Sequence, residues 1–238
     1  MLDQKNSPYH LDVLNTLNEM KRQGLIRSIS TRNFPPAMLR SALGCGFEIL
    51  SNDSAGSLLN SYNLQSESDM GVLNNEWECS RLFSAPLAGG LLTNQYSLHR
   101  EWSNLTSADK KKCGALFKGC CSGLGNGDNS DKWKRYRARF DVLVDISAKY
   151  EVSIESVALR WLLQLNPSDS LVVGSRLGMD FVEENGGAPY NKGRAFRQVY
   201  TFSLEEEDME RLSKVSGFTS YDHVQSDVLE AKDKALWL

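Results

Sequence analysis

The stretch best suited to chemistry is a loop of small residues that follows the predicted strand 78–84. It reads Ala-Pro-Leu-Ala-Gly-Gly over residues 85–90 and continues into a pair of leucines. Pro86 fixes one backbone angle, while Gly89 and Gly90 let the main chain approach a bound molecule closely. A loop at the C-terminal end of a strand is where α/β barrels place their ligand sites. By itself, the pattern also fits an ordinary turn.

Three other predicted strand ends carry polar residues. They follow the predicted strands 25–30, 47–50 and 170–173, and they comprise residues 31–34, 51–54 and 174–176. Asn33 suits a turn, because an asparagine side chain bonds readily to nearby backbone. Arg176 suits either a surface ion pair or the binding of an anionic group. Neither residue alone distinguishes a binding site from a loop.

Helical periodicity accounts for most of the chain between these strands. It predicts helices over 9–23, 37–43, 67–75, 134–149, 154–166 and 180–185, and one that runs to 214 from a Ser-x-x-Glu capping box at Ser203. Ser153 is the predicted cap of the helix that begins at Ile154. Strands that alternate with helices favour a parallel sheet with crossover helices. Four strands are predicted, whereas a (β/α)8 barrel needs eight.

Two segments lack a clear period and are interpreted as loop insertions in a single domain of residues 1–238. They are residues 97–132 and 186–200. The first contains Gly-Leu-Gly-Asn-Gly at 123–127, which resembles part of a nucleotide-binding loop. No predicted strand precedes it, so the motif lacks the context that nucleotide binding requires. A surface loop is therefore the preferred interpretation of 97–132.

The composition excludes several classes of protein. With 41% hydrophobic residues, 24% charged residues and a net charge of −3, the chain is globular and has no long basic block for nucleic acid. No apolar run approaches the ~18 residues that span a membrane. The five cysteines, Cys45, Cys79, Cys113, Cys120 and Cys121, are odd in number and irregularly spaced. This usage favours an intracellular compartment, cytoplasmic or organellar, and predicts no metal site.

Five stretches, in this order, resemble the second half of an aldo-keto reductase. They are residues 17–34, 47–60, 85–96, 157–163 and 172–185. The resemblance implies an α/β fold that is a partial TIM (β/α)8 barrel, made of about its last four β/α units with loop insertions. It also implies NADP(H) as the cofactor and a small carbonyl compound as the substrate.

Carried over residue by residue, the resemblance implies a cofactor site along the strand ends. Asn33 would bind the nicotinamide carboxamide. The loop of Pro86, Leu87, Ala88 and Gly89 would contact the pyrophosphate through its backbone. Gly174, Ser175 and Arg176 would hold the adenosine phosphate, and Glu184 and Asn185 the adenine. A guanidinium can clamp a 2′-phosphate with two hydrogen bonds, so Arg176 favours NADP over NAD.

Three positions depart from the family pattern on the nicotinamide side. Arg32 stands where the family has Ser, and Asp53 stands where it usually has Gln. Ser84 stands where an aromatic residue stacks on the nicotinamide. The neighbouring Phe83 does not replace it, because alternation along a strand points the two side chains in opposite directions.

The family's catalytic Asp, Tyr, Lys and His lie on the first four strands of the barrel, before the matched stretches. His10 falls after those strands, so no catalytic residue is assigned. The resulting hypothesis is an NADP-linked oxidoreductase in which this chain supplies the cofactor-binding half and is inactive by itself. The alternative is a non-catalytic nucleotide-binding or interaction protein on a degenerate half-barrel. Half a barrel exposes sheet edges, which a partner chain or a second copy would cover.

Overall fold

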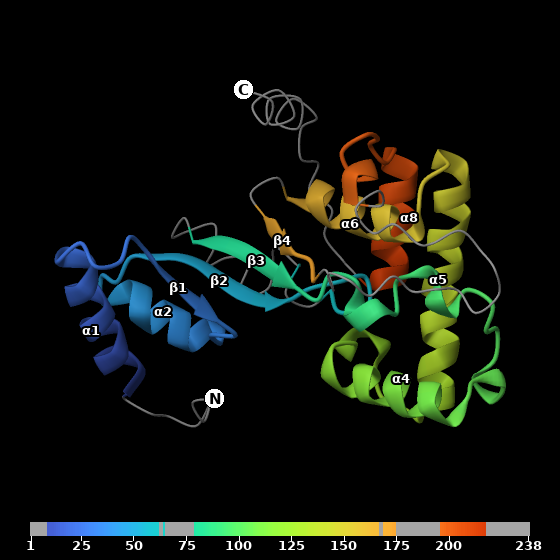
Figure 1. Cartoon of the computed structure of the whole chain (residues 1–238), viewed down its shortest axis with the longest axis horizontal. Helices are drawn as coiled ribbons and strands as arrows, with labels where there is room; N and C mark the ends of the chain where they lie inside the picture. The colour runs from blue at the N-terminus through green and yellow to red at the C-terminus, as the bar shows by residue number, and fades with distance from the viewer. Residues whose placement is uncertain (1–8, 62–63, 65–78, 167–168, 175–195, 218–238) are drawn as a thin grey trace.

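A parallel sheet of four strands is the frame of the computed structural model (Figure 1). The strands are β1 Ile29–Arg32, β2 Ile49–Ala55, β3 Ser80–Ser84 and β4 Ser170–Val172, and they lie in this order. All three strand pairings are parallel, which confirms the prediction from the alternation of strands and helices. The structure describes residues 9–61, 64, 79–166, 169–174 and 196–217.

Helices gather at both ends of this sheet. They are α1 Tyr9–Arg22, α2 Pro36–Gly44, α4 Ser107–Gly119, α5 Asn129–Tyr150, α6 Ile154–Leu165 and α8 Glu206–Ser216. In Figure 1, α1 and α2 lie beside β1 and β2, whereas α4, α5, α6 and α8 form a group at the opposite end. Within the described ranges, no helix is long and apolar enough to cross a bilayer. The predicted helices 67–75 and 180–185 lie outside these ranges.

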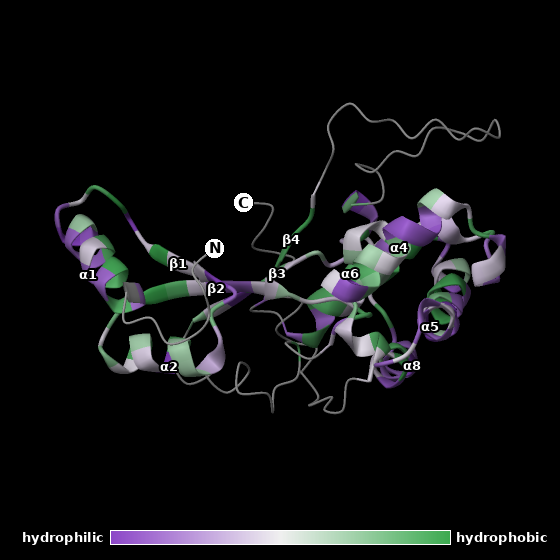
Figure 2. Cartoon of the chain, turned by 90° about the horizontal axis from the view of Figure 1, so that it is seen from below, coloured by the Kyte–Doolittle hydropathy of each residue, from purple (hydrophilic) through white to green (hydrophobic). Residues whose placement is uncertain are grey.

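The second strand is longer and more polar than predicted. Residues 51–54 were expected to form a loop after the strand, but they lie inside β2. In Figure 2 the β2 ribbon begins in green and turns purple along its polar part. Polar side chains are accommodated because β1 supplies partners: Ser51 Oγ donates to Ser30 Oγ at 2.9 Å, and Thr31 Oγ1 donates to Asn52 Oδ1 at 2.9 Å. Strand pairing therefore satisfies residues whose types suggested a loop.

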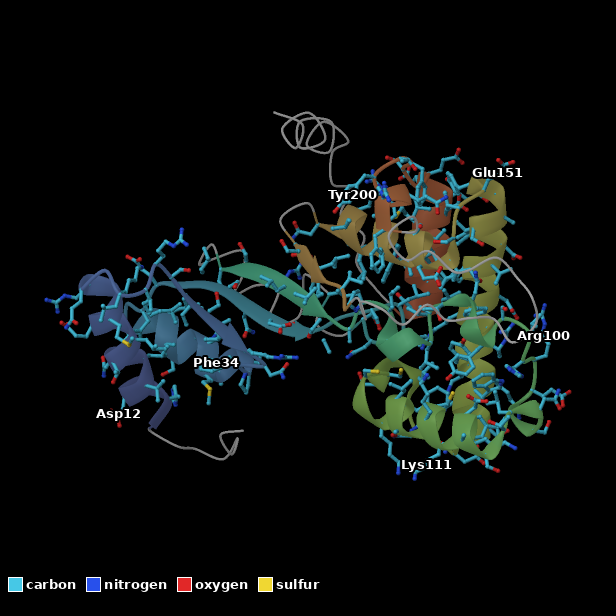
Figure 3. The ribbon with its side chains drawn as sticks, in the orientation of Figure 1. Asp12, Phe34, Arg100, Lys111, Glu151 and Tyr200 are labelled. Carbon is cyan, nitrogen blue, oxygen red and sulfur yellow. The ribbon has the colours of Figure 1, made fainter. Side chains whose placement is uncertain are left out.

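Residues 97–132 are not the irregular loop that the sequence suggested. They contain α4, the short 3₁₀ helices η4 Trp102–Asn104 and η5 Ser122–Leu124, and the start of α5. Thr106 caps α4 by accepting a hydrogen bond from the Asp109 N–H. Buried Cys113 and Phe117 lie one turn apart on this helix, while Lys111 lies on its outer side (Figure 3). The apolar face of α4 is too narrow to be recognised from periodicity. That the segment is an insertion stays a prediction.

The caps of the later helices are partly as predicted. Ser153 Oγ accepts from the Ser156 N–H at 3.2 Å, which confirms it as the cap of α6. The predicted capping box at Ser203 is wrong, because the residue before α8 is Glu205. Ser203 Oγ instead accepts a hydrogen bond from Arg160 of α6 at 2.6 Å. The segment before α8 is thus held by its neighbours α6 and α5, since the Glu205 N–H also donates to the Tyr150 hydroxyl of α5 at 2.9 Å.

Two separate hydrophobic clusters fill the molecule. The small cluster lies among α1, α2, β1 and β2, and its buried members are Leu14, Ile29, Leu39, Ala42, Leu43, Phe47, Ile49 and Cys79. The large cluster joins α4, α5, α6 and α8 to β3 and the loop after it. It contains the buried aromatic residues Phe83, Tyr96, Phe117, Trp133, Tyr136, Phe140 and Trp161. Of the strand ends that form the candidate site, that of β1 borders the small cluster and that of β3 borders the large cluster.

Candidate functional site

The four strands end on the same side of the sheet, because all of them are parallel. With the strands in sequence order, the segments that leave β1, β2, β3 and β4 follow one another along this C-terminal side. Asn33 follows β1, the 85–90 loop follows β3 and Gly174 lies two residues after β4. The described part of the predicted site therefore lies on the C-terminal side of the sheet. Ser175, Arg176, Glu184 and Asn185 lie outside the described residues.

The segment after β1 is held in a defined conformation by a buried asparagine that sequence reasoning missed. Asn52, which is buried, receives a hydrogen bond from the Phe34 N–H and donates one to the Phe34 carbonyl, each at 3.3 Å. The Asn33 N–H donates to the Asp53 carbonyl at 2.7 Å. Asn33 itself has a positive φ of 53° and is exposed. These contacts fix the backbone while the Asn33 side chain stays accessible to a ligand.

Arg32 and Asp53, two of the departures from the family pattern, form an ion pair. They are register partners on β1 and β2, with Arg32 Nε 3.2 Å from Asp53 Oδ2. The Arg32 side chain is 71% exposed, whereas that of Asp53 is 19% exposed. Asp53 Oδ1 is buried and accepts no hydrogen bond within the described part of the chain. A buried carboxylate oxygen without a donor is costly, so this atom is a candidate acceptor for a ligand.

Ser84 and Phe83 lie on opposite faces of the sheet, as alternation predicted. Ser84 pairs with Ala55 and Val172, whereas Phe83 pairs with Ser54 and is fully buried in the large cluster. The Phe83 ring packs against Gly56, where an added Cβ would collide with it. Phe83 is therefore a core residue, and a shift by one position does not bring an aromatic ring from β3 to the candidate site.

The loop after β3 has a strained backbone. Ala85 and Ala88 have φ values of 56° and 50°, and Gly89 and Gly90 have φ values of 68° and 100°. For an alanine, the left-handed region costs about 1–2 kcal/mol. Strain of this kind persists where the surroundings enforce it, and it is typical of ligand-binding segments.

The loop also presents backbone donors. Its Ala88 N–H donates to the Ala85 carbonyl at 2.8 Å, and its Gly90 N–H donates to the Leu87 carbonyl at 3.0 Å. Among the described residues, the N–H groups of Leu87 and Gly89 donate to no acceptor. Successive N–H groups around a change from right-handed to left-handed backbone form a concave anion site. Leu87 and Ala88 make such a change, since their φ values are −97° and 50°.

Two buried side chains hydrogen-bond to the backbone just after this loop, at Leu91 and Asn94, and the sequence predicted neither contact. The Tyr136 hydroxyl of α5 donates to the Leu91 carbonyl at 2.8 Å. Burial raises the pKa of Tyr136, so the hydroxyl keeps the proton that it donates. Glu155, at the start of α6, accepts from the Asn94 N–H at 3.3 Å. An apolar stripe predicts that Tyr136 packs inward, but no sequence pattern predicts where its hydroxyl bonds.

The far end of the site is positioned by a buried ion pair. Arg81 of β3 bonds to Asp169 through two hydrogen bonds, Nε to Oδ1 at 2.8 Å and Nη2 to Oδ2 at 2.7 Å. Both side chains are buried. Asp169 immediately precedes β4. This pair therefore aligns β4 with β3 and fixes where β4, and Gly174 after it, lies along the sheet. In the described part of the chain, no cluster of three or more His, Cys, Asp or Glu residues could hold a metal ion.

Comparison with known proteins agrees with this arrangement of strands and loops. A profile of the Aldo/keto reductase family matches residues 3–187. A thermostable aldo-keto reductase in complex with the inhibitor epalrestat has a similar structure, with a TM-score of 0.52 and 17% identity over 85% of this chain and 53% of that one. An aldo/keto reductase from Brucella melitensis matches with a TM-score of 0.51 and 15% identity, again over 85% and 53%.

This chain therefore spans about half the length of the solved structures that it resembles. A search of curated proteins found no match. The similarity to solved structures supports the α/β fold, and the family profile covers most of the chain, including the segments after β1, β2 and β3. The chain belongs to the aldo/keto reductase family.

Proposed function

We propose that this chain is the cofactor-binding part of an NADP(H)-linked oxidoreductase that transfers a hydride between nicotinamide and a carbonyl or alcohol substrate. The observation that carries the proposal is the strained 85–90 loop, in which the N–H groups of Leu87 and Gly89 donate to no acceptor among the described residues. Family membership suggests oxidoreductase chemistry. The chain would correspond to about the last four units of a (β/α)8 barrel, and the catalytic Asp, Tyr, Lys and His would come from the other half.

The loop after β3 suits the pyrophosphate of the cofactor. The N–H groups of Leu87 and Gly89 would donate to phosphate oxygens, and Pro86 and Ala88 would shape the turn between them. Gly89 suits this position chiefly because it has a positive φ, and a Cβ there would also displace the end of the Leu116 side chain. Its bare main chain is what allows a close approach by a phosphate.

The segment after β1 suits the nicotinamide carboxamide. NADPH would supply the hydride when bound, and this chain would hold the ring end in place. The exposed Asn33 amide offers both a donor and an acceptor for a carboxamide. Asp53 Oδ1, which accepts no hydrogen bond from the described residues, is an acceptor only, which suits the carboxamide NH2. Asp53 would then do part of what Gln does elsewhere in the family.

The adenosine end would be held by residues after β4. Gly174 would leave the backbone open, Ser175 and Arg176 would bind the 2′-phosphate, and Glu184 and Asn185 would contact the adenine. Arg176→Ala is expected to weaken NADPH much more than NADH, because only NADPH carries the 2′-phosphate. Unchanged NADPH affinity in the Arg176→Ala variant would show that the adenosine end is assigned wrongly.

The experiment that tests the loop is a fluorescence titration of NADPH with Gly89→Ala. We expect at least a tenfold loss of affinity, because an added Cβ at a φ of 68° strains this turn and moves the N–H groups away from the phosphate, and a hydrogen bond to a charged group contributes about 1.5–3 kcal/mol. Gly119→Ala is the matched control, since a Cβ at this position meets no described atom within 4 Å. Thermal unfolding confirms that both variants fold. Equal NADPH affinity in the two folded variants would contradict the proposal.

A second candidate function is nucleotide binding without chemistry. It is favoured by one observation: Arg32 pairs with Asp53, and Phe83 is buried, so the nicotinamide side differs from the family pattern while the phosphate loop fits it. Incubation of this chain with NADPH and an aldehyde, together with the half that would carry the catalytic Asp, Tyr, Lys and His, separates the two functions. Loss of NADPH absorbance supports an enzyme, whereas binding without turnover, in the presence of any partner chain that covers the sheet edges, supports a sensor. Either function places the chain in an intracellular, NADPH-containing compartment.

A further inference from the structure

Two adjacent cysteines form a thiol pair that the proposed cofactor site does not use. Cys120 is the C-cap residue of α4, and Cys121 precedes η5. Their Sγ atoms are 3.8 Å apart and share a hydrogen bond. Cys121 is 1% exposed, while Cys120 is partly exposed. The sequence pattern Cys-Cys matches no metal or redox spacing, so this contact becomes visible only in the structure.

The two thiols differ in acidity because of this contact. The hydrogen bond from Cys121 lowers the pKa of Cys120, although burial acts in the opposite direction. The same hydrogen bond, together with burial, raises the pKa of Cys121. The partly exposed sulfur is therefore the more easily ionised one, and a thiolate is the reactive form of cysteine.

We propose that Cys120 and Cys121 are a vicinal dithiol that a peroxide oxidises reversibly to a disulfide. In the first step the Cys120 thiolate attacks a peroxide oxygen, and the O–O bond breaks. With hydrogen peroxide, the products are Cys120 sulfenic acid and hydroxide. In the second step the Cys121 sulfur attacks the Cys120 sulfur, the S–S bond forms and water leaves with the Cys121 proton. Two thiols are oxidised and one peroxide is reduced to two waters.

The electrostatics of the pair change between these two steps. Before oxidation, the Cys120 thiolate disfavours a second negative charge on Cys121. A sulfenic acid carries no such charge at neutral pH, so the first step removes this repulsion, while the burial that also raises the pKa of Cys121 remains. The order of reaction, Cys120 first and Cys121 second, follows from the exposure of Cys120 and the burial of Cys121.

The surroundings let the sulfur atoms move while the backbone stays. Cys120 Sγ donates a weak hydrogen bond to the Leu116 carbonyl at 3.4 Å. This bond is given up when the side chain rotates toward Cys121. Beyond Cys121, η5 is docked on the turn after β2: the Gly123 N–H donates to the Leu59 carbonyl at 3.1 Å, and Ser122 Oγ donates to Asn60 Oδ1 at 2.8 Å. Neighbouring Cα atoms lie only about 3.8 Å apart, below the usual range for disulfides, so the bond would be strained and easily reduced.

Peptide mapping of the folded chain after mild treatment with hydrogen peroxide tests the proposal. Trypsin cleaves after Lys112, Lys118 and Lys132, so Cys113 and the Cys120–Cys121 pair fall on different peptides, 113–118 and 119–132. We expect peptide 119–132 to lose about 2 Da, and a thiol reductant to restore its mass. A cross-link between the two peptides, or only oxygen addition to 119–132, would overturn the proposal.

Single variants assign the order of the two steps. Cys121→Ser is expected to stop at Cys120 sulfenic acid, a gain of about 16 Da that dimedone traps. Cys120→Ser is expected to resist oxidation at this peptide. Cys45→Ser, which removes the exposed cysteine of α2's C-terminus, serves as the control and keeps the full response. Dimedone trapping on Cys121 in Cys120→Ser, at a rate equal to that on Cys120 in Cys121→Ser, would contradict the assigned order.

Discussion

The two ends of the candidate site are held by different parts of the molecule and by different kinds of contact. The 85–90 loop lies on the large aromatic cluster and is anchored by Tyr136 and Glu155. The Asn33 segment lies beside the small cluster, whose only aromatic member among its buried residues is Phe47, and it depends on the polar contacts of Asn52. The difference indicates how strain is maintained. The loop keeps Ala88 at positive φ because a dense core surrounds this fully buried residue, whereas the Asn33 segment keeps its shape through hydrogen bonds.

The largest expected effect is from deletion of a central aromatic residue. Phe140→Ala removes a fully buried ring of the large cluster and should lower the free energy of unfolding by about 3–5 kcal/mol. Leu39→Ala removes a fully buried side chain of the small cluster and should cost about 2–5 kcal/mol. Native-state hydrogen exchange distinguishes the two: we expect Phe140→Ala to loosen the hydrogen-bonded amides 88 and 90–92, and Leu39→Ala to loosen only the β1 and α2 region. Loosening of the loop by Leu39→Ala would show that the loop also depends on the small cluster.

A smaller effect is expected at the polar anchor of the Asn33 segment. Asn52→Ala leaves both backbone groups of Phe34 without their partner and should destabilise the fold by about 1–3 kcal/mol. The loss should be confined to amides 31–34 in hydrogen exchange and should weaken NADPH binding. Ser41→Ala, at an exposed position of α2, is the control. Wild-type exchange rates at 31–34 in Asn52→Ala would show that the segment is held in another way.

A pH dependence of stability is expected on the side of the large cluster. Burial alone would raise the pKa of Asp208, but hydrogen bonds from Lys149 and Tyr150 outweigh burial and hold the pKa below its ordinary value. The ionised carboxylate therefore stabilises the α5–α8 contact above about pH 4, and this stabilisation is lost as pH falls through the lowered pKa. Asp208→Asn should lower Tm at neutral pH, and its difference from wild type should shrink in acid.

Thermal unfolding between neutral and acidic pH measures this difference. Glu207→Gln is the matched control, because Glu207 is an exposed neighbour on the same helix. We expect this control to follow the wild-type curve. A Tm difference for Asp208→Asn that is the same at every pH would show that the contact does not depend on the ionised carboxylate.

The smallest effect on stability is expected from the exposed partner at the nicotinamide end. Arg32→Ala breaks the pair with Asp53, but Arg32 is 71% exposed, and exposed pairs contribute at most about 1 kcal/mol. Chemical denaturation of Arg32→Ala should therefore give nearly the wild-type free energy of unfolding. A large loss of unfolding free energy would mean that Arg32 is needed to hold β1 and β2 together.

Much of this architecture follows from sequence patterns. The wide apolar stripes of α5 and α6 predict both helices, and alternation along β3 predicts that Phe83 points into the core. The narrow face of α4 hides a helix inside a segment that reads as a loop. The polar part of β2 was missed because its side chains find partners on β1, which periodicity does not record.

The candidate site was predictable in position but not in detail. Strand ends followed by Asn33 or by Pro86–Gly89 indicate where a ligand would bind. Within the described part of the chain, Asp53 Oδ1 and the N–H groups of Leu87 and Gly89 have no hydrogen-bond partner. This depends on backbone angles and on burial, which no residue type specifies. The same is true of the contact between Cys120 and Cys121.

The most direct test of the central claim is NMR titration of the chain with NADPH, observed at the backbone amides of Leu87 and Gly89. If these N–H groups bind the cofactor's phosphates, both amide signals shift together and saturate with one Kd, while the Gly119 amide stays in place. If NADPH binds and the Leu87 and Gly89 signals do not move, or if it does not bind at all, the loop after β3 is not the cofactor site and the account is wrong.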